Sequence, residues 1–253
     1  MKYVLDTHCH TLASGHAYST IGELVDVAKE KGLELIAITE HGPDMPGAPH
    51  FYYFGNLKVV PPIIKGVKIL KGIEANIIDY DGNVDLNSKR LKKLDIVLAS
   101  LHEICLKPGS MDENTKAVIG AMNNPLIDII AHPGNPQYTL DFDLIVEEAA
   151  KTNTLIEINN SSFVSSRRGS YENCLYIIRR CKELNIPISL GSDTHYADDV
   201  GDFSKAVKLV KEVNFPEELI INTSVDKLLN YLREKGKQPL RDVRADIEGM
   251  NTL

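Results

Sequence analysis

The strongest constraint in this chain is the segment Asp6-Thr7-His8-Cys9-His10, which ends the apolar run Tyr3-Val4-Leu5. In an extended strand alternate side chains share a face, so His8 and His10 point the same way and Cys9 points to the other. A lone histidine beside an apolar segment is usually a hydrogen-bonded core residue. Two imidazoles on one face are arranged as a metal clamp, and His16 follows nearby, so the positions of the other histidines decide the interpretation.

The rest of the chain alternates short apolar runs, rich in Val and Ile, with segments of helical period. This rhythm is typical of repeated βα units around a parallel sheet. A final unit, 219–221 followed by 224–234, is predicted to close the ring. The other predicted strands are 3–7, 33–39, 67–74, 96–101, 127–131, 154–158 and 188–191, and the predicted helices are 20–31, 88–93, 113–123, 141–152, 172–184 and 203–213.

Length and composition set the scale of the fold. The 253 residues, 43% hydrophobic and 25% charged, are enough for one large core, and no linker or low-complexity stretch divides them. We therefore expect a single domain over residues 1–253, with its core at about 3–235. Residues 237–253 carry mixed charge with little apolar period, and the sequence leaves open whether they form a tail or a homo-oligomer contact.

The balance of charge weighs weakly against a polyanionic partner. The formal net charge is −7, so we do not expect nucleic acid to bind, although a cluster of divalent ions would attract phosphate locally. Lys2 leads directly into the first predicted strand, and no segment approaches the roughly 20 apolar residues of a membrane span. We expect a cytoplasmic protein without a membrane partner.

The histidines fall where the predicted strands end. In a parallel barrel the carboxyl ends of the strands converge on one mouth, which is where such folds place their chemistry. Of the eight histidines only His50 lies outside this pattern, whereas core histidines would be scattered along strands and helices. The candidate ligands are His8, His10, His16, His41, Glu74, His102, His132, Asp193 and His195.

The type and number of these side chains indicate which ions they suit. Seven imidazoles with carboxylates and no thiol pair favour zinc, manganese or iron, whereas calcium and magnesium favour oxygen-rich cages. Nine candidates are too many for one ion. With three or four protein ligands per catalytic ion, the count predicts two or three divalent ions, with one carboxylate bridging.

Six short motifs follow one another along the chain: Asp6-Thr7-His8-Cys9-His10, Thr39-Glu40-His41-Gly42, Gly72-Ile73-Glu74, Ser100-Leu101-His102, Ala131-His132-Pro133 and Gly191-Ser192-Asp193-Thr194-His195. This ordered set resembles the motifs of the polymerase and histidinol phosphatase (PHP) superfamily, and in particular its small YcdX-like bacterial phosphatases. The resemblance runs over roughly residues 3–235.

The resemblance implies a distorted seven-stranded (β/α)7 TIM-like barrel with three metal ions, usually zinc, at the carboxyl-end mouth. No ligand position of the motifs is substituted in this chain. The implied ligand sets are His8, His10, Glu74 and Asp193 for one ion, Glu74, His102 and His132 for a second that Glu74 bridges, and His16, His41 and His195 for a third.

Such a site is expected to hydrolyse phosphate esters. A hydroxide bridging two ions, its pKa pulled from that of bulk water toward about 7, would attack phosphorus in line while the ions neutralise the phosphoryl oxygens. Glu74 is then the catalytic bridge. Asp193 is a ligand first, and acts as a base only if one of its oxygens stays free.

Two further segments are candidates for contacting the substrate. Polar groups and guanidinium forks follow the sixth strand, and they suit either a phosphate-binding loop, to which the resemblance also points, or a solvated loop. Residues 42–55 are too aromatic for a spacer, and either cover the mouth as a lid or pack on the barrel rim. The predicted substrate-binding residues are Asn160, Ser162, Arg167, Arg168 and, to contact substrate or protonate the leaving group, His50.

The functional hypotheses that follow from these features fall into three groups. The leading one is a metal-dependent phosphomonoesterase that acts on a small phosphorylated substrate. The alternatives among enzymes are a phosphodiesterase or exonuclease, which a basic groove with stacking aromatics beside the mouth would favour, and a histidinol-phosphatase-like enzyme. A non-catalytic metal-binding domain is the third, and it requires a site without an open coordination position.

Overall fold

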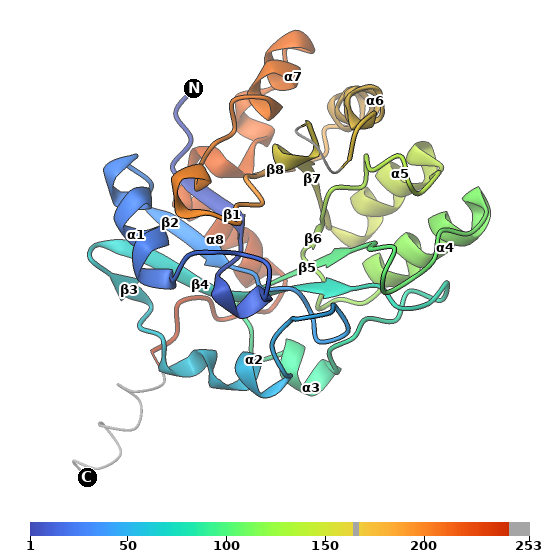
Figure 1. Cartoon of the computed structure of the whole chain (residues 1–253). Helices are drawn as coiled ribbons and strands as arrows, with labels where there is room; N and C mark the ends of the chain where they lie inside the picture. The colour runs from blue at the N-terminus through green and yellow to red at the C-terminus, as the bar shows by residue number, and fades with distance from the viewer. Residues whose placement is uncertain (164–166, 243–253) are drawn as a thin grey trace.

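Seven parallel strands run around a nearly closed barrel, and helices cover its outside (Figure 1). The computed structural model describes residues 1–163 and 167–242. The strand order is β1-β2-β4-β5-β6-β7-β8, and the short β3 pairs antiparallel with β4. The strands are β1 Leu5–Cys9, β2 Leu35–Ile38, β3 Ile63–Ile64, β4 Val67–Asn76, β5 Ile96–Ser100, β6 Ile129–Ile130, β7 Leu155–Asn159 and β8 Ile188–Gly191.

Polar side chains cap the amino termini of several helices. Thr20 and Ser110 each form a capping box with a glutamate three residues later, Glu23 and Glu113, so amides that the first turn leaves free are satisfied. Together with the strands, these helices confirm the predicted α/β barrel. The helices are α1 Ile21–Glu30, α2 Tyr52–Asn56, α3 Ser88–Leu91, α4 Met111–Met122, α5 Phe142–Thr152, α6 Ser170–Glu183, α7 Ala206–Glu212 and α8 Val225–Glu234.

Helix α8 packs against the strands and fills one side of the core. Leu228 and Leu232 of α8 are fully buried in one cluster with Leu35, Leu70 and Leu98 of three different strands. Burial of each leucine contributes roughly 1.5–3 kcal/mol relative to exposure, so this contact holds α8 firmly to the barrel. The carboxyl ends of the strands, where the candidate ligands lie, are left to polar side chains.

Between β1 and β8 the barrel is closed by the side chain of Asn222, because these two strands do not form a continuous ladder of backbone hydrogen bonds. In the described residues the end of β1 instead bridges the segment that follows β8, at Cys9 and Thr194, and the Asp193 amide donates to the His8 carbonyl at 3.0 Å. The fully buried Asn222 amide accepts a hydrogen bond from the Leu190 amide at 2.7 Å and donates to the carbonyls of Leu5 and Leu190 at 3.0 and 2.8 Å. Asn222 thus satisfies backbone groups on both sides of the seam.

Two local predictions differ from the structure. The segment predicted as a strand at 219–221 falls in two 3-10 helices, Glu217–Leu219 and Ile221–Thr223, and only Ile220 bridges to Ile188 of β8. A short buried apolar run has no period that separates strand from turn, which explains this error. The aromatic loop 42–55 runs into α2, which the sequence prediction missed and which buries Phe54 in the core.

The end of the chain is described only in part. Lys237 forms an ion pair with the buried carboxylate of Asp128, so the start of the predicted tail is fixed to the barrel. Residues 243–253, which belong to the same prediction, lie outside the described residues. In residues 1–163 and 167–242, no helix has the length and apolar character needed to cross a bilayer.

The seam predicts a specific stability effect. Asn222→Ala should lower the free energy of unfolding by about 2–4 kcal/mol, because it removes three buried hydrogen bonds to backbone groups of Leu5 and Leu190. Urea unfolding followed by circular dichroism measures this change. Asn230→Ala, at an exposed position of α8, is the matched control and should change stability by less than about 0.5 kcal/mol. Equal effects of the two substitutions would contradict the role assigned to Asn222.

Candidate metal centre

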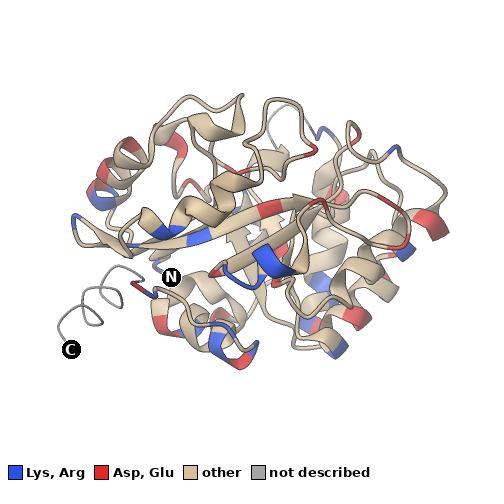
Figure 2. Ribbon diagram, turned by 90° about the horizontal axis from the view of Figure 1, so that it is seen from below, with Lys and Arg blue, Asp and Glu red and all other residues tan. Residues whose placement is uncertain are grey.

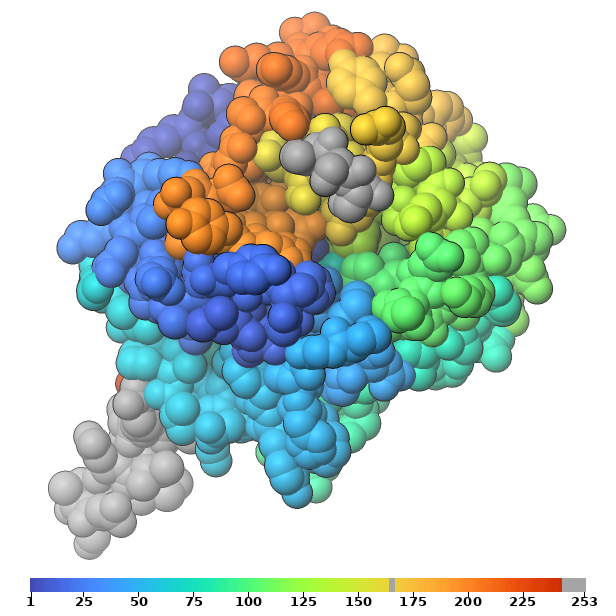
Figure 3. Space-filling view, in the orientation of Figure 1, coloured from blue at the N-terminus to red at the C-terminus, as the bar shows by residue number. Residues whose placement is uncertain are grey.

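The candidate ligands converge on a cavity at the carboxyl-end mouth of the barrel. The cavity has a volume of about 510 Å³, and its lining includes His16, His41, His102, Asp193 and His195. In Figure 3 the dark blue amino-terminal segment and the orange and yellow segments from late in the chain meet on one face of the molecule. Residues far apart in sequence therefore build one site.

Within the described residues, three groups of side chains have ligand atoms within 4.8 Å of one another. His132 joins them through its Nε2, 2.7 Å from Glu74 Oε1, and His16 through its Nε2, 3.2 Å from His41 Nε2. All nine predicted ligands thus lie together, although the groups only overlap with the sets that the family resemblance implies. The three groups are His8, His10 and Asp193; His10, His41 and His195; and His41, Glu74 and His102.

The fully buried carboxylate of Glu74 lies at the centre of the cluster. Its Oε2 is 3.4 Å from the Nε2 atoms of both His8 and His10 and 2.7 Å from His41 Nδ1. Its Oε1 faces His132 and, at 3.5 Å, His102. Burial alone would raise the pKa of Glu74, but the surrounding imidazoles hold it well below its usual value. Each carboxylate oxygen therefore faces a different set of imidazoles, as a bridging ligand requires.

Unpaired atoms show that this donor set fits metal ions. Glu74 Oε2, His41 Nδ1 and Asp193 Oδ1 are buried without a hydrogen-bond partner in the described residues, so the short Glu74–His41 approach is not a hydrogen bond. The Nε2 atoms of His8 and His10 lie 3.1 Å apart, although a pair of such nitrogens can share only one proton. Leaving a buried polar atom unpaired costs about 1–3 kcal/mol, and divalent cations would satisfy these atoms.

The protonation of the rings also suits ligation. Burial lowers the pKa of most of these imidazoles, which keeps them neutral and able to bind a cation at neutral pH. His8 differs, because the carboxylates of Glu157, Asp193 and Glu74 outweigh the effect of burial and raise its pKa well above the usual value. A bound cation would take the place of the proton on that ring. The imidazoles with lowered pKa are His10, His16, His102 and His132.

Three of the rings are oriented by a partner at the nitrogen that faces away from the cluster. His8 Nδ1 lies 2.8 Å from Glu157 Oε1, and His102 Nδ1 lies 2.7 Å from Asn76 Oδ1. His10 Nδ1 contacts Ser14 Oγ at 3.1 Å. Such partners fix the tautomer and the direction of a ligating imidazole.

The sequence interpretation missed these supporting residues. Glu157 lies in the apolar strand β7 and is almost fully buried, and a carboxylate in a buried strand is a signal that could have identified it. Its second oxygen accepts from the His132 amide at 2.9 Å, so Glu157 positions two candidate ligands. Gly191 makes room for it, because a Cβ there would lie 1.9 Å from Glu157 Oε1.

A second buried carboxylate, Glu40, organises the segment before His16. It accepts hydrogen bonds from the Thr11 amide and hydroxyl at 3.0 and 2.6 Å, and from the Ser14 hydroxyl at 2.6 Å. The Tyr53 hydroxyl of α2 donates to it at 3.2 Å. Glu40 therefore connects the 3-10 turn Leu12–Ser14 to α2 and indirectly, through Ser14, to His10.

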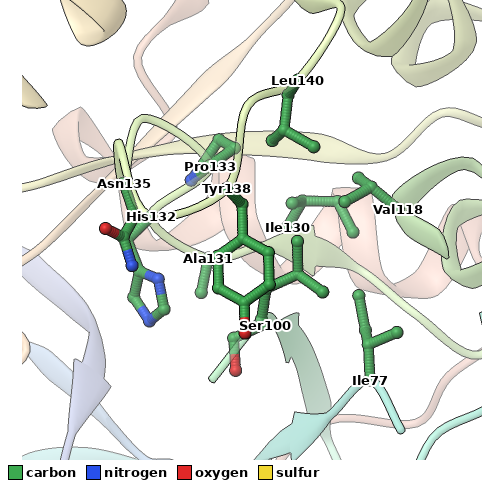
Figure 4. A pocket seen from close by; sticks show the side chains of 11 residues that line it. Ile77, Ser100, Val118, Ile130, Ala131, His132, Pro133, Asn135, Tyr138 and Leu140 are labelled. Carbon is green, nitrogen blue, oxygen red and sulfur yellow. The ribbon is translucent and has the colours of Figure 1, made fainter. Parts of the chain in front are cut away.

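Backbone geometry directs two further candidate ligands into the mouth. His132 and Asp193 have φ angles of 34° and 55°, in the left-handed region that residues other than glycine rarely adopt. Figure 4 shows a pocket beside His132 whose lining includes Val118, Ile130 and Tyr138, three buried members of the hydrophobic core. The turn at His132 therefore adjoins the buried core.

The predicted substrate-binding residues separate into two groups. Arg167 and Asn160 line the mouth, and Arg167 Nη1 donates to Asp193 Oδ2 at 3.0 Å. Ser162 is buried beneath Arg167, whose Nη1 lies 3.5 Å from its hydroxyl. Arg168 and His50 are exposed and are not among the lining residues, and the His50 ring instead packs against the adjacent aromatic rings of the 42–55 loop and α2.

Comparison with known proteins agrees with this architecture. The sequence matches the PHP domain family over residues 6–167. A protein of Caldanaerobacter subterraneus named probable phosphatase is 56% identical over 94% of this chain and 94% of its own length. Another of that name from Clostridium novyi is 52% identical over 97% of this chain and its full length. The chain therefore belongs to the PHP domain family.

Solved structures confirm the fold. A crystal structure of histidinol phosphate phosphatase from Lactococcus lactis, in complex with zinc, L-histidinol and phosphate, superposes with a TM-score of 0.57. The two sequences are 20% identical, and the match covers 85% of this chain and 95% of the other. At this identity the likeness establishes the barrel and not the substrate.

The contact between Glu157 and His8 predicts an effect on metal affinity. Glu157→Gln keeps the shape of the side chain but removes the charge that accepts from His8 Nδ1, so metal affinity should fall roughly 10–100-fold. Competition with a chromophoric chelator measures the affinity. Glu147→Gln, at an exposed position of α5, is the matched control. If both variants bound metal as the unmodified protein does, Glu157 would have no positioning role.

Proposed function

We propose that this member of the PHP domain family is a metal-dependent phosphomonoesterase with three divalent transition-metal ions at the barrel mouth, most suitably zinc. The central position of Glu74 carries this proposal, since its two oxygens face separate sets of imidazoles. His8, His10 and Asp193 would hold one ion beside Glu74 Oε2. His102 and His132 would hold a second beside Glu74 Oε1, and His16, His41 and His195 a third.

The residues of the chain divide the work of hydrolysis. When bound, the ions would activate water as a nucleophile and neutralise charge on the phosphoryl oxygens. Arg167 presents a fixed guanidinium to the same cavity, where it can bind a phosphoryl oxygen and orient the ester. Asp193 has one oxygen facing His8 and His10 and the other accepting from Arg167, which supports its role as a ligand over that of a general base.

The lining of the mouth supports a small monoester over a nucleic-acid strand. Among the described lining residues Arg167 is the one Lys or Arg side chain, whereas Asp199 and Asp202 border the same cavity. A strand of phosphates would need a continuous track of cations leading to the ions. The names of the relatives, probable phosphatase, also support a phosphatase, and the exonuclease is the weaker candidate.

The two adjacent arginines provide a matched test of phosphate binding. Arg167→Ala should raise the Michaelis constant for p-nitrophenyl phosphate roughly tenfold, because the guanidinium would bind a phosphoryl oxygen. Metal content is measured in the same samples, because Arg167 also donates to Asp193. Arg168→Ala removes the same charge from an exposed position and should leave the kinetics within about twofold. Unchanged kinetics in the Arg167 variant would show that this loop is a solvated loop that does not bind phosphate.

The reaction class is tested by comparing a monoester with a diester. The cationic mouth should bind the two charges of a monoester better than the one charge of a diester. We expect kcat/KM for p-nitrophenyl phosphate to exceed that for bis(p-nitrophenyl) phosphate by at least about tenfold, or roughly 1.4 kcal/mol. Chelation should abolish both reactions. A preference for the diester, or faster release of nucleotides from single-stranded DNA, would favour the exonuclease instead.

A further inference from the structure

Two short helices on the flank of the barrel, α2 and α3, border a groove that the metal centre does not use. The groove, here called the α2–α3 groove, has a volume of about 700 Å³ and is lined by Tyr52, Tyr53, Lys58, Lys89, Arg90 and Lys93 together with two small or polar residues. It shares no lining residue with the mouth. Any ligand that it binds would therefore be separate from the phosphate ester at the ions.

The α2–α3 groove concentrates positive charge in a chain whose formal net charge is −7. Within the described residues, no carboxylate lines it. Lys58, Lys89 and Lys93 are exposed, and in the described part of the chain none of them forms an ion pair. Figure 2 views the molecule from the side of α2 and α3 and shows Lys and Arg segments on this face. Clustered like charges favour a bound anion.

A second cavity continues this positive surface. It has a volume of about 690 Å³ and shares Lys58 and Lys93 with the α2–α3 groove. It adds Lys71 and Lys92, while Asp95 is the one carboxylate among its described lining residues. Burial raises the pKa of Asp95 to about 6, so its charge is weakened in mildly acidic solution. Cations therefore outnumber carboxylates along both cavities.

Aromatic rings lie beside these cations. Tyr52 is 71% exposed, so its ring is accessible to a ligand in the groove. Arg90 lies 4.2 Å from the centroid of the Phe51 ring, a cation–π contact that holds its guanidinium in place. Aromatic faces next to Lys and Arg side chains match a ligand that carries both a planar base and phosphates.

We propose that the α2–α3 groove binds a free nucleotide with two or more phosphates. The base would stack on Tyr52, and the phosphates would bind Lys58, Lys89 and Lys93. The volume of the groove lies in the range of pockets for single small ligands. The acidic balance of the whole chain disfavours a long polyanion, which supports a free nucleotide over a nucleic-acid strand.

The proposal is tested with a nucleotide that resists hydrolysis at the ions. Adenosine 5′-(β,γ-methylene)triphosphate is titrated into the metal-loaded full chain by calorimetry. The double variant Lys89→Glu and Lys93→Glu should raise the Kd for this nucleotide at least about tenfold. Its kcat and KM for p-nitrophenyl phosphate should not change. Lys208→Glu with Lys211→Glu, two exposed lysines of α7, makes the same change of charge elsewhere and should bind as the unmodified chain does.

Substitutions of the ring test the placement of the base. Tyr52→Ala should weaken the Kd about tenfold, and Tyr52→Phe should keep the affinity, because stacking needs the ring and not the hydroxyl. No binding by the unmodified chain, or equal binding by it and the Lys89/Lys93 double variant, would overturn the proposal. Tighter binding of a short single-stranded oligothymidylate, lost in that double variant, would replace the nucleotide with nucleic acid.

Discussion

The buried carboxylate of Glu74, surrounded by five imidazoles, is the interaction on which the rest of the site depends. Moving a charge out of water costs several kcal/mol, and a carboxylate is kept ionised there only if opposite charge compensates it. The raised pKa of His8 lets that ring carry part of the compensating charge, whereas burial keeps His10, His102 and His132 neutral, and neutral rings compensate weakly. Divalent ions between Glu74 and the rings would supply the missing positive charge, which explains why such a cluster can exist in a folded core.

The barrel makes this cluster possible by fixing its members on different strands. Glu74 lies in the second half of β4, which pairs with β5, and on its other side it bridges to His41, so neighbours on both sides hold it. Candidate ligands on β1 and after β8 meet across the seam that Asn222 closes. Buried partners such as Glu157 then set the direction of individual rings. The strand ends, the seam and the partners that orient the rings therefore connect the fold to the proposed chemistry.

The sequence predicted the barrel and the converging ligands because both depend on periodic patterns. Histidines directly after apolar runs must lie at one end of a parallel barrel, whatever the loops do. Glu157 escaped prediction because its partner His8 is distant in sequence, and only the fold brings the two together. The sequence does not show which of Arg167 and Arg168 faces the mouth. Adjacent arginines in a loop are chemically identical, and only the direction of each side chain in the folded protein distinguishes them. The strand expected at 219–221 failed for a similar reason, because burial and strand formation both select apolar residues.

Anomalous diffraction is the direct test of the proposal that Glu74 bridges ions in a three-metal mouth. Crystals of the zinc-loaded protein, measured above and below the zinc absorption edge, locate each ion without assumptions about ligands. We expect three peaks in the mouth, with Glu74 Oε1 and Oε2 each contacting a different one. A single peak, or peaks that leave Glu74 outside the coordination distance of about 2.0–2.2 Å, would contradict it.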